Sequence, residues 1–417
     1  MSNGIANGSR RGFLRGCAAV LGAAAVVPLL NEGEARAATA GPDPDQLFRA
    51  GRFAAADRGY ARLLAADPGD AHAWAQRGYL ALLSNRFGDT ERFLGAAIKL
   101  APGDTVSMSR LADCYVRRGD FARAVPLLRA AGDRIGATQY GAITGTPYQI
   151  SGASSARLPF LTLDPLPSVG VTVNGTTAPF TLDTGATFTF SAAMAKAAGV
   201  KPVATVAVNH GNGPIPGYIG VVDSLRLGQL EVRNIPVVWD DASFIASPGD
   251  GRPVGVIGTT LFYHFQVTMD YAGRALTVRR PGAARPAGVA TAPLWLAPDH
   301  FIFSRGSVGK AEPGLVLVDT GGVGLGAVLT ETQAAAAGVI PDYGKPETDF
   351  GVTVYPCAAD AALGGVTRQD TPGVVGPIPS PVEFGFDYLG TLSHDFFKPL
   401  SVTFDFTTMA TYITTGP

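Results

Sequence analysis

The sequence predicts a multidomain protein in which an all-α solenoid precedes a mainly-β region built as two similar lobes. Residues 45–135 have helical periodicity and a repeat of 34 residues. From about residue 165 onward, apolar and polar residues alternate in short runs separated by turns, which is typical of β-strands. Within this β region one series of motifs occurs twice, and the duplication predicts two lobes of the same architecture.

The composition agrees with a large, turn-rich β protein. A chain of 417 residues is long enough for two or three domains and a sizeable core. It contains 53 Gly and 31 Pro, which favours turns and strands over a helical bundle. The formal net charge is only −1, and no basic stretch occurs beyond the N-terminus, so we expect no nucleic-acid partner.

The first 40 residues resemble a bacterial twin-arginine signal peptide. Ser9–Leu14 has the sequence S-R-R-G-F-L, an apolar run extends from Cys17 to Leu30, and small residues precede Ala40. A membrane anchor is the alternative, but this run is shorter than the roughly 20 apolar residues of a bilayer span and contains Pro28. The resemblance implies export to the periplasm or the medium, with no membrane span after the signal is removed.

The helical part repeats with a fixed period. Phe53, Phe87 and Phe121 are 34 residues apart, and so are Pro68 and Pro102. A helix-turn-helix unit of this length resembles the tetratricopeptide repeat, of which about three units are needed for stability. The resemblance implies a surface that docks a polypeptide or a protein partner. A helical spacer without a ligand is the alternative.

The β region begins after a stretch rich in Gly, Thr, Pro and Ser at 137–165, which we interpret as a linker that ends in a first strand. Val169–Val173 then alternates, and Asn174-Gly175 is the preferred sequence of a type I′ hairpin turn. Phe180–Leu182 returns as the next strand.

Four landmarks recur in the same order in the two halves of the β region. They are a D-T-G triplet (Asp183–Gly185, Asp319–Gly321), a short helix ending in Ala-Gly-Val (Ala193–Val200, Glu331–Val339), an apolar pair before a glycine (Gly258, Gly390) and a closing strand (Phe265–Asp270, Leu400–Asp405). One D-T-G triplet arises easily by chance in turns. Two triplets within matching landmarks are far more specific.

This duplicated pattern resembles the pepsin-like and retropepsin-like aspartic proteases over about residues 165–415. The resemblance implies a mainly-β bilobal protease, with two retropepsin-like β-barrel lobes related by a pseudo-two-fold axis. The expected divisions are the signal peptide (1–40), the helical repeats (41–136), the linker and first strand (137–165), lobe 1 (166–286) and lobe 2 (287–417). Because one chain contains both lobes, we expect a monomer.

The resemblance also assigns the site. Asp183 and Asp319 would form a catalytic pair that shares one proton, the effect for which aspartic proteases are the standard example. One carboxylate would activate water while the other, protonated, polarises the scissile carbonyl. Four neighbours would support the pair, with the threonine hydroxyls bonding across the two loops and the glycines allowing tight turns: Thr184, Thr320, Gly185 and Gly321.

Other family features map onto the glycines and loops of the two halves. Gly258 and Gly390 would pack behind the D-T-G loops. Asn209–Tyr218 lies where a flap is expected to cover the cleft, and Tyr218 is the residue we expect to contact substrate. Gly351–Pro356 is the corresponding stretch of the second half, although Gly and Pro there also suit an ordinary surface turn.

The second triplet also fits a nucleotide-binding pattern, because Gly322-x-Gly324-x-x-Ala327 matches G-x-G-x-x-G/A. That function needs a helix followed by a parallel strand, whereas Ile340–Pro346 contains two prolines. The first copy of the loop lacks the pattern altogether. We therefore expect the loop to carry a carboxylate and the protein to need no cofactor.

Metal and thiol chemistry have little support in the sequence. The five histidines are scattered, without H-E-x-x-H or C-x-x-C, so we expect no metal site. Cys114 and Cys357, which remain after signal removal, are expected to be unpaired buried thiols.

Two functions from different classes remain. The first is an exported aspartic endopeptidase, and the second is a non-catalytic extracytoplasmic scaffold that binds peptides. Gly322 stands where the family usually has Ala, Ser or Thr, and the added flexibility would loosen the pair. The intact D-T-G in both halves favours the peptidase, although a fold by itself does not determine function.

Overall fold

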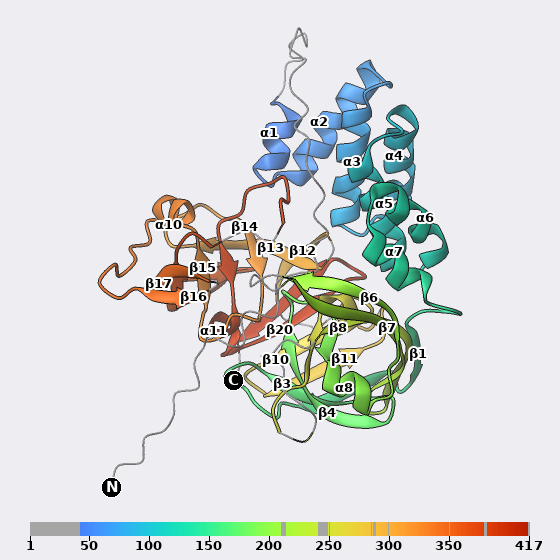
Figure 1. Cartoon of the computed structure of the whole chain (residues 1–417). Helices are drawn as coiled ribbons and strands as arrows, with labels where there is room; N and C mark the ends of the chain where they lie inside the picture. The colour runs from blue at the N-terminus through green and yellow to red at the C-terminus, as the bar shows by residue number, and fades with distance from the viewer. Residues whose placement is uncertain are drawn as a thin grey trace.

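The computed structural model describes residues 42–209, 214–240, 249, 251–284, 286, 289–298, 300–349, 351–378 and 382–415. The expected signal peptide lies outside these residues. Among the described helices, none has both the length and the apolar character that crossing a membrane requires. The architecture is a helical region followed by a mainly-β region (Figure 1).

The helical region keeps the 34-residue period of the sequence. The helices that begin at Phe53, Phe87 and Phe121 are α2, α4 and α6. Asp70 and Asp104, also 34 residues apart, cap α3 and α5 by accepting hydrogen bonds from the backbone three residues on. The helices are α1 (Pro44–Arg49), α2 (Phe53–Ala66), α3 (Ala71–Leu83), α4 (Phe87–Leu100), α5 (Thr105–Arg117), α6 (Phe121–Ala131) and α7 (Arg134–Gly141).

The β region begins earlier than the sequence indicated. The stretch 137–165, interpreted as a linker with one strand, contains the end of α7 and two strands, β1 (Gln149–Gly152) and β2 (Ser155–Pro159). Each strand joins a different sheet, since β1 pairs with β8 (Leu230–Asp240) and β2 with β11 (Ala275–Arg279). The segment between the helical and β regions is therefore part of both sheets.

Lobe 1 is built on an eight-stranded sheet in the order β1-β8-β5-β9-β4-β3-β7-β6. The expected hairpin is present, because Asn174 and Gly175 join β3 to β4 with φ of 46° and 89°, as a type I′ turn requires. The remaining elements of this lobe are β3 (Ser168–Val173), β4 (Thr176–Asp183), β5 (Thr189–Ser191), α8 (Ala192–Ala197), β6 (Pro202–Asn209), β7 (Pro214–Leu227), β9 (Gly255–Gly258) and α9 (Thr259–Phe262).

Lobe 2 repeats this order of elements. Its helix α10 is followed by Gly338, which has a left-handed backbone, as α8 is followed by the left-handed Gly199. Its elements are β12 (Ala290–Ala297), β13 (Phe301–Val308), β14 (Gly314–Val318), β15 (Ala327–Leu329), α10 (Glu331–Ala337), β16 (Glu347–Asp349), β17 (Val352–Leu363), β18 (Val366–Val375), β19 (Thr391–Leu392), α11 (His394–Phe397), β20 (Leu400–Asp405) and β21 (Ala410–Thr415).

A run of antiparallel strands joins the two lobes, in the order β12-β21-β20-β10-β11-β2. At its centre β10 (Gln266–Asp270) pairs with β20, so the two closing strands matched in the sequence are direct neighbours. Thr268 lies opposite Thr403, and their hydroxyls are 2.8 Å apart. The pseudo-two-fold relation between the lobes is centred on this pair.

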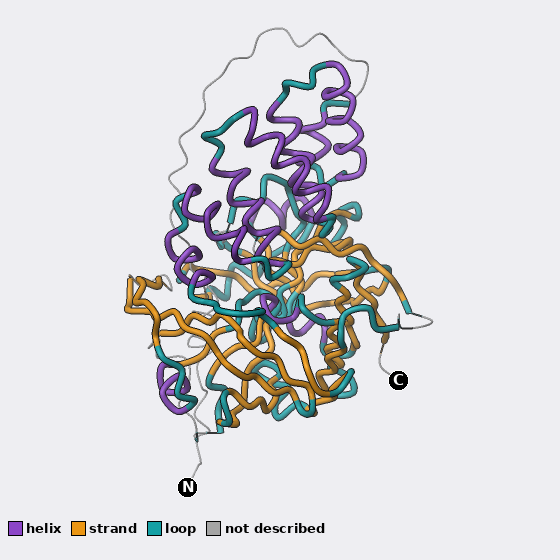
Figure 2. The backbone as a smooth tube through the Cα atoms, turned by 90° about the vertical axis from the view of Figure 1, so that its right-hand side faces the viewer, coloured by secondary structure: helices purple, strands orange, loops and turns teal. Residues whose placement is uncertain are grey.

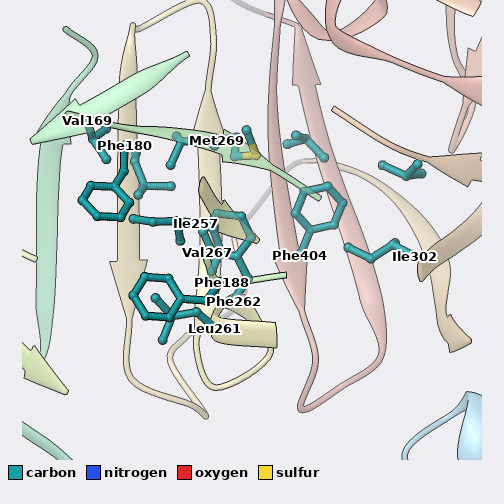
Figure 3. Close-up of a cluster of buried hydrophobic side chains, with 14 of the residues drawn as sticks. Val169, Phe180, Phe188, Ile257, Leu261, Phe262, Val267, Met269, Ile302 and Phe404 are labelled. Atoms are coloured by element: carbon teal, nitrogen blue, oxygen red, sulfur yellow. The ribbon is translucent and has the colours of Figure 1, made fainter. Parts of the chain in front are cut away.

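The main apolar core extends across both lobes. Phe180 of lobe 1, Met269 of the central strand and Phe404 of its partner belong to one buried cluster (Figure 3). All three side chains are fully buried. Because a continuous core of this kind resists shear, it fixes the positions of the two D-T-G loops relative to each other.

The helical region is packed onto the β region along one side (Figure 2). The ring centroid of Phe53 lies 5.2 Å from those of Trp295 and Phe386 in lobe 2. The buried guanidinium of Arg117 donates to the carbonyl of Leu296 at 3.1 Å. Further along, α7 contacts β6, β7 and β8 of lobe 1, so the helical region touches both lobes.

Candidate active site

Each D-T-G triplet follows a strand of a parallel pair. In lobe 1, β4 pairs with β9, which places Asp183 opposite Gly258. In lobe 2, β14 pairs in the same way with β19, and the N–H of Asp319 donates to the carbonyl of Leu392. Both loops therefore emerge at the same end of equivalent strand pairs, and the pseudo-two-fold relation brings them face to face.

The two carboxyl groups lie against each other's loops. Gly185 N–H donates to Asp183 Oδ1 at 2.7 Å, and Gly321 N–H donates to Asp319 Oδ1 at 2.9 Å. A Cβ on Gly185 would overlap the carboxyl group of Asp319, and one on Gly321 would overlap that of Asp183. Glycine is required at both positions because the opposite carboxyl group occupies the space.

The two threonines join the loops from behind. Thr184 N–H donates to Thr320 Oγ1 at 3.0 Å, and Thr320 N–H donates to Thr184 Oγ1 at the same distance. The hydroxyl of Thr184 also donates to the carbonyl of Val318 at 2.9 Å. Both threonines are fully buried. These reciprocal bonds have the arrangement that the sequence resemblance implied for Thr184 and Thr320.

The electrostatics of the pair follow from this proximity. Burial raises the pKa of Asp319, and the charge of Asp183 and a hydrogen bond between the two side chains raise it further. Asp183 is only 1 % exposed, so its carboxyl group cannot move into solvent to relieve the repulsion. The electrostatics of the pair therefore favour a proton on Asp319.

The support behind the lobe 1 loop is Gly258, as expected. A Cβ at this position would overlap the carbonyl group of Ala186, the residue that follows the triplet. The hydroxyl of Thr259, the next residue, donates to the carbonyl of Thr184 at 2.8 Å. The loop and the N-terminus of α9 are thus in direct backbone contact, which only glycine allows.

The expected counterpart in lobe 2, Gly390, is wrong. Gly390 lies beside Leu329, and its carbonyl accepts a hydrogen bond from Leu317 N–H. Gly390 therefore precedes by three residues the position that lies opposite Asp319. That position belongs to Ser393, which precedes α11 as Gly258 precedes α9. The spacing of 135 residues that separates Thr268 from Thr403 also separates Gly258 from Ser393, and this spacing is the sequence signal that identifies the correct residue.

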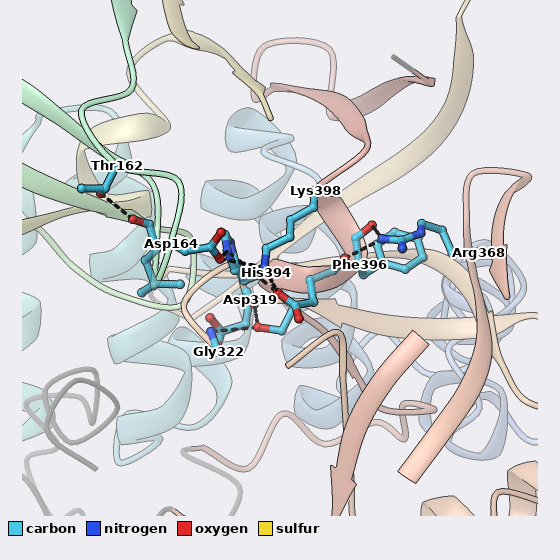
Figure 4. A network of polar contacts seen from close by, with 11 residues as sticks. Thr162, Asp164, Asp319, Gly322, Arg368, His394, Phe396 and Lys398 are labelled. Carbon is cyan, nitrogen blue, oxygen red and sulfur yellow. Dashed lines mark hydrogen bonds and ion pairs between the residues drawn. The ribbon is translucent and has the colours of Figure 1, made fainter. Parts of the chain in front are cut away.

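The hydroxyl of Ser393 holds the lobe 2 loop in place through two hydrogen bonds (Figure 4). The oxygen accepts a hydrogen bond from Gly322 N–H at 2.8 Å and donates to the carbonyl of Asp319 at 2.5 Å. Gly322 is buried, and a Cβ there would overlap the hydroxyl of Ser393. A hydrogen bond thus holds the backbone of Gly322, and its missing side chain makes room for Ser393, while the flexibility expected at this position stays a prediction.

The expected flaps are hairpins, one in each lobe. In lobe 1, β6 and β7 form a long antiparallel pair whose tip, 210–213, lies outside the described residues. Tyr218 lies on β7 opposite Thr205, and its ring stacks on Trp239 with centroids 5.8 Å apart. In lobe 2, Gly351–Pro356 includes the turn and the first residues of β17, which pairs with β16.

The glycine-rich turn at 322–326 has no helix directly after it. The strand β15 follows, and α10 begins only at Glu331. Phosphate binding by a glycine-rich loop depends on the N–H groups of a helix that starts at the loop. The turn therefore lacks the geometry of a nucleotide site and carries Asp319 instead.

A cluster of charged residues lies beside the lobe 2 loop (Figure 4). Asp164, on the segment between β2 and β3, is grouped with His394 and Asp395 of α11 closely enough to hold a cation. The ammonium group of Lys398 lies 2.7 Å from both Asp164 and Asp395. The lysine therefore already provides the positive charge that these carboxylates need. Cys114 and Cys357 are both free thiols in separate regions, and Cys114 is buried as expected, whereas Cys357 is only partly buried.

Sequence reasoning missed a histidine beside the pair. His300 lies in the turn between β12 and β13 and is 1 % exposed. Its Nε2 is 3.1 Å from the carbonyl oxygen of Gly185, so a ring from lobe 2 contacts the triplet of lobe 1. The two residues are 115 positions apart, and nothing in the local sequence around His300 indicates this contact.

The structure has two mainly-β lobes that each contribute one D-T-G aspartate, an arrangement that resembles the aspartic proteinase fold. Residues 169–261 match the family model described as aspartyl protease. This match covers most of lobe 1, including its triplet, and shows that this part of the chain is similar to that family.

Similarity to individual proteins is low. The comparison with curated proteins gives no match. Among solved structures, the chain is similar to the aspartic proteinase from Irpex lacteus, with 14 % sequence identity and a TM-score of 0.41. That similarity covers 63 % of this chain and 97 % of the other.

Proposed function

We propose that this protein is an aspartic endopeptidase that hydrolyses peptide bonds with the Asp183 and Asp319 pair. The observation that supports the proposal most directly is the reciprocal position of the two carboxyl groups, each against the glycine of the opposite loop. A pair held this closely keeps one shared proton, so a base and an acid are available at the same place.

The reaction follows from the raised pKa of Asp319. Asp319 holds the proton and donates it toward the carbonyl oxygen of the scissile bond, while the Asp183 carboxylate takes a proton from water. The hydroxide adds to the carbonyl carbon and forms a tetrahedral diol. The proton on Asp183 then passes to the amide nitrogen, a hydroxyl of the diol returns its proton to Asp319, and the C–N bond breaks. No cofactor takes part in these steps.

The helical region supports a role in docking. We propose that it is a tetratricopeptide-like solenoid, on the basis of the helices that begin at Phe53, Phe87 and Phe121. Because one side of it packs on Trp295 and Phe386, a polypeptide substrate or protein partner would use the helix faces turned away from the lobes. The twin-arginine resemblance of residues 1–40 supports export to the periplasm or the medium, where the mature chain acts as a monomer.

The experiment is an assay of the purified protein against a diverse peptide library between about pH 3 and pH 9, a range that includes the raised pKa of Asp319. Asp183→Asn and Asp319→Asn should each reduce turnover by about 10³-fold or more, because each removes one partner of the acid–base pair. Asp387→Asn, at an exposed position away from the pair, is the matched control and should retain full activity.

The outcomes separate the peptidase from the scaffold. Full activity in both single variants would contradict the assignment of the pair. Tight peptide binding by the wild type without cleavage at any pH would instead support a non-catalytic binding protein.

A further inference from the structure

We propose that His300 is a positioning residue of the aspartate pair, holding the lobe 1 triplet from the lobe 2 side and placing an ionisable ring beside Asp319. This inference rests on the proposed peptidase function, which it extends by one residue. It starts from the contact between His300 Nε2 and the Gly185 carbonyl at 3.1 Å. Since a carbonyl oxygen can only accept, Nε2 must carry the hydrogen.

The contact reaches the carboxyl group of Asp183 through a single residue. Gly185 donates its N–H to Asp183 Oδ1 at 2.7 Å and offers its carbonyl to His300. Glycine has no side chain that restricts its backbone, so this loop depends on external bonds to stay in one conformation. The imidazole supplies such a bond from the opposite lobe, where it is 1 % exposed and packed against the ring of Phe301 at 4.1 Å.

His300 also acts on the pair by charge. A proton on its ring lowers the pKa of Asp319, which opposes the effects of burial and of Asp183. The carboxyl group of Asp319 lies close enough to the ring for this charge to act on it. A cation at this point stabilises the pair when it loses its shared proton, so the ionisation state of His300 should shift the pH range of activity.

The residue at the position equivalent to His300, Asp164, does not contact a D-T-G triplet in the same way. Asp164 precedes His300 by 136 residues, the same spacing as between Asp183 and Asp319. Asp164 lies between β2 and β3 and His300 between β12 and β13, and each side chain contacts the other half of the β region. Asp164 is 62 % exposed and pairs with Lys398, whereas His300 is buried against the triplet itself. Only the lobe 2 turn places a ring next to the reacting groups.

The test compares His300→Gln and His300→Ala in the full chain. Gln keeps an N–H donor but cannot be charged, and Ala removes both. In peptide cleavage, His300→Ala should lower kcat about ten-fold with little change in KM, because one buried hydrogen bond that orients the pair is lost. His300→Gln should retain most of kcat and move the alkaline limb of the pH profile upward, because the charge that lowers the pKa of Asp319 is gone. His72→Gln, in the helical region and half exposed, is the matched control.

A second measurement keeps this inference separate from the peptidase proposal. The pKa of Asp319 can be followed by ¹³C NMR of aspartate carboxyl groups without substrate, with Asp319→Asn to assign the signal. An upward shift in His300→Gln supports the role of His300 even if the wild type cleaves nothing, in which case only the peptidase proposal fails. Normal turnover with an unmoved titration and an unchanged pH profile in both variants would overturn the role of His300. If His300→Ala does not fold, His300→Gln alone decides.

Discussion

Lobe 1 has Ala186 after its triplet and Gly258 behind it, whereas lobe 2 has Gly322 after its triplet and Ser393 behind it. In lobe 1 the loop backbone rests directly on glycine, and in lobe 2 a serine hydroxyl fills the space that a glycine leaves open. The side chain thus belongs to the loop in lobe 1 (Ala186) and to the supporting residue in lobe 2 (Ser393), while the contact between loop and support is kept. The pseudo-symmetry of the molecule therefore preserves the packing and the hydrogen bonds of the loops. The residue types at equivalent positions can differ as long as these contacts are kept.

The largest effect on stability is expected from Gly258→Ala in lobe 1. The new Cβ would overlap the carbonyl group of Ala186, which is backbone and cannot rotate away. We expect a loss of about 3 kcal/mol or more in the free energy of unfolding, at the upper end of overpacking effects. Denaturant unfolding followed by circular dichroism measures it.

The matched control for that substitution is Gly88→Ala. Gly88 lies in α4 with open space where a Cβ would be added, so the change should be neutral or slightly stabilising. If Gly258→Ala cost less than about 1 kcal/mol, the lobe 1 loop would be able to shift and the two supports would not differ as described.

A double substitution in lobe 2 tests whether the two supports are interchangeable. Gly322→Ala alone should destabilise, because its Cβ overlaps the Ser393 hydroxyl, and Ser393→Gly alone should leave the Gly322 N–H buried without a partner. Together they recreate the Ala186 and Gly258 arrangement of lobe 1. We expect each single change to cost about 1–3 kcal/mol and the double variant to recover about 1 kcal/mol or more relative to their sum.

Additivity of the two changes would contradict this account. Peptide cleavage should also be measured for the two single variants and the double variant, because the hydroxyl of Ser393 donates to the carbonyl of Asp319. Recovery of stability without recovery of kcat would mean that Ser393 orients Asp319 as well as filling space.

The sequence predicted those features that depend on local pattern. The 34-residue period placed the starts of α2, α4 and α6, and Asn174-Gly175 placed the first hairpin. The bilobal fold followed from the repeated landmarks. In each case a few consecutive residues determine the structure, because turn chemistry and helix capping act over short distances.

The misplaced features depend on pairing between distant residues. An apolar pair followed by glycine occurs at Gly390 as well, and the register of β14 with β19 shows that Ser393 is the true support. His300 has no motif, because its partner is Gly185 in the other lobe. One strand was expected within 137–165, whereas the structure has two short ones, β1 and β2, whose pairing partners β8 and β11 lie far along the chain.

The pH dependence of stability can show what the pair costs the folded state. The pKa of Asp319 is raised in the folded protein above its ordinary value of 3.8, to about 8. The contribution of protonated Asp319 to the free energy of unfolding is therefore fully present below pH 3.8. It is lost as the pH rises toward 8, where Asp319 must ionise inside the folded protein. Asp319→Asn removes this cost, so it should be more stable than the wild type near pH 8, by about 1–3 kcal/mol, and similar to it near pH 3.5.

Thermal unfolding between pH 3.5 and pH 8.5 measures this difference, with Asp387→Asn as the control that should follow the wild type throughout. A constant difference between Asp319→Asn and the wild type at all pH values would show that the substitution acts through packing. It would also argue against a shared proton.

The smallest effect on stability is expected at the surface ion pair between Asp164, on the segment before lobe 1, and Lys398 of lobe 2. Burial raises the pKa of Asp164, but hydrogen bonds from Lys398 and His394 outweigh it and the pKa is lowered overall, so the stabilisation is lost as the pH falls below 3.8. Because Asp164 is largely exposed, Asp164→Asn should cost at most about 1 kcal/mol, less in high salt, and leave kcat unchanged. The contrast with His300→Ala is informative, since the two residues are pseudo-symmetric and only the buried ring contacts a triplet. A fall in kcat for Asp164→Asn would mean that α11 transmits strain through Ser393 to Asp319, and the two interlobe contacts would then be equivalent.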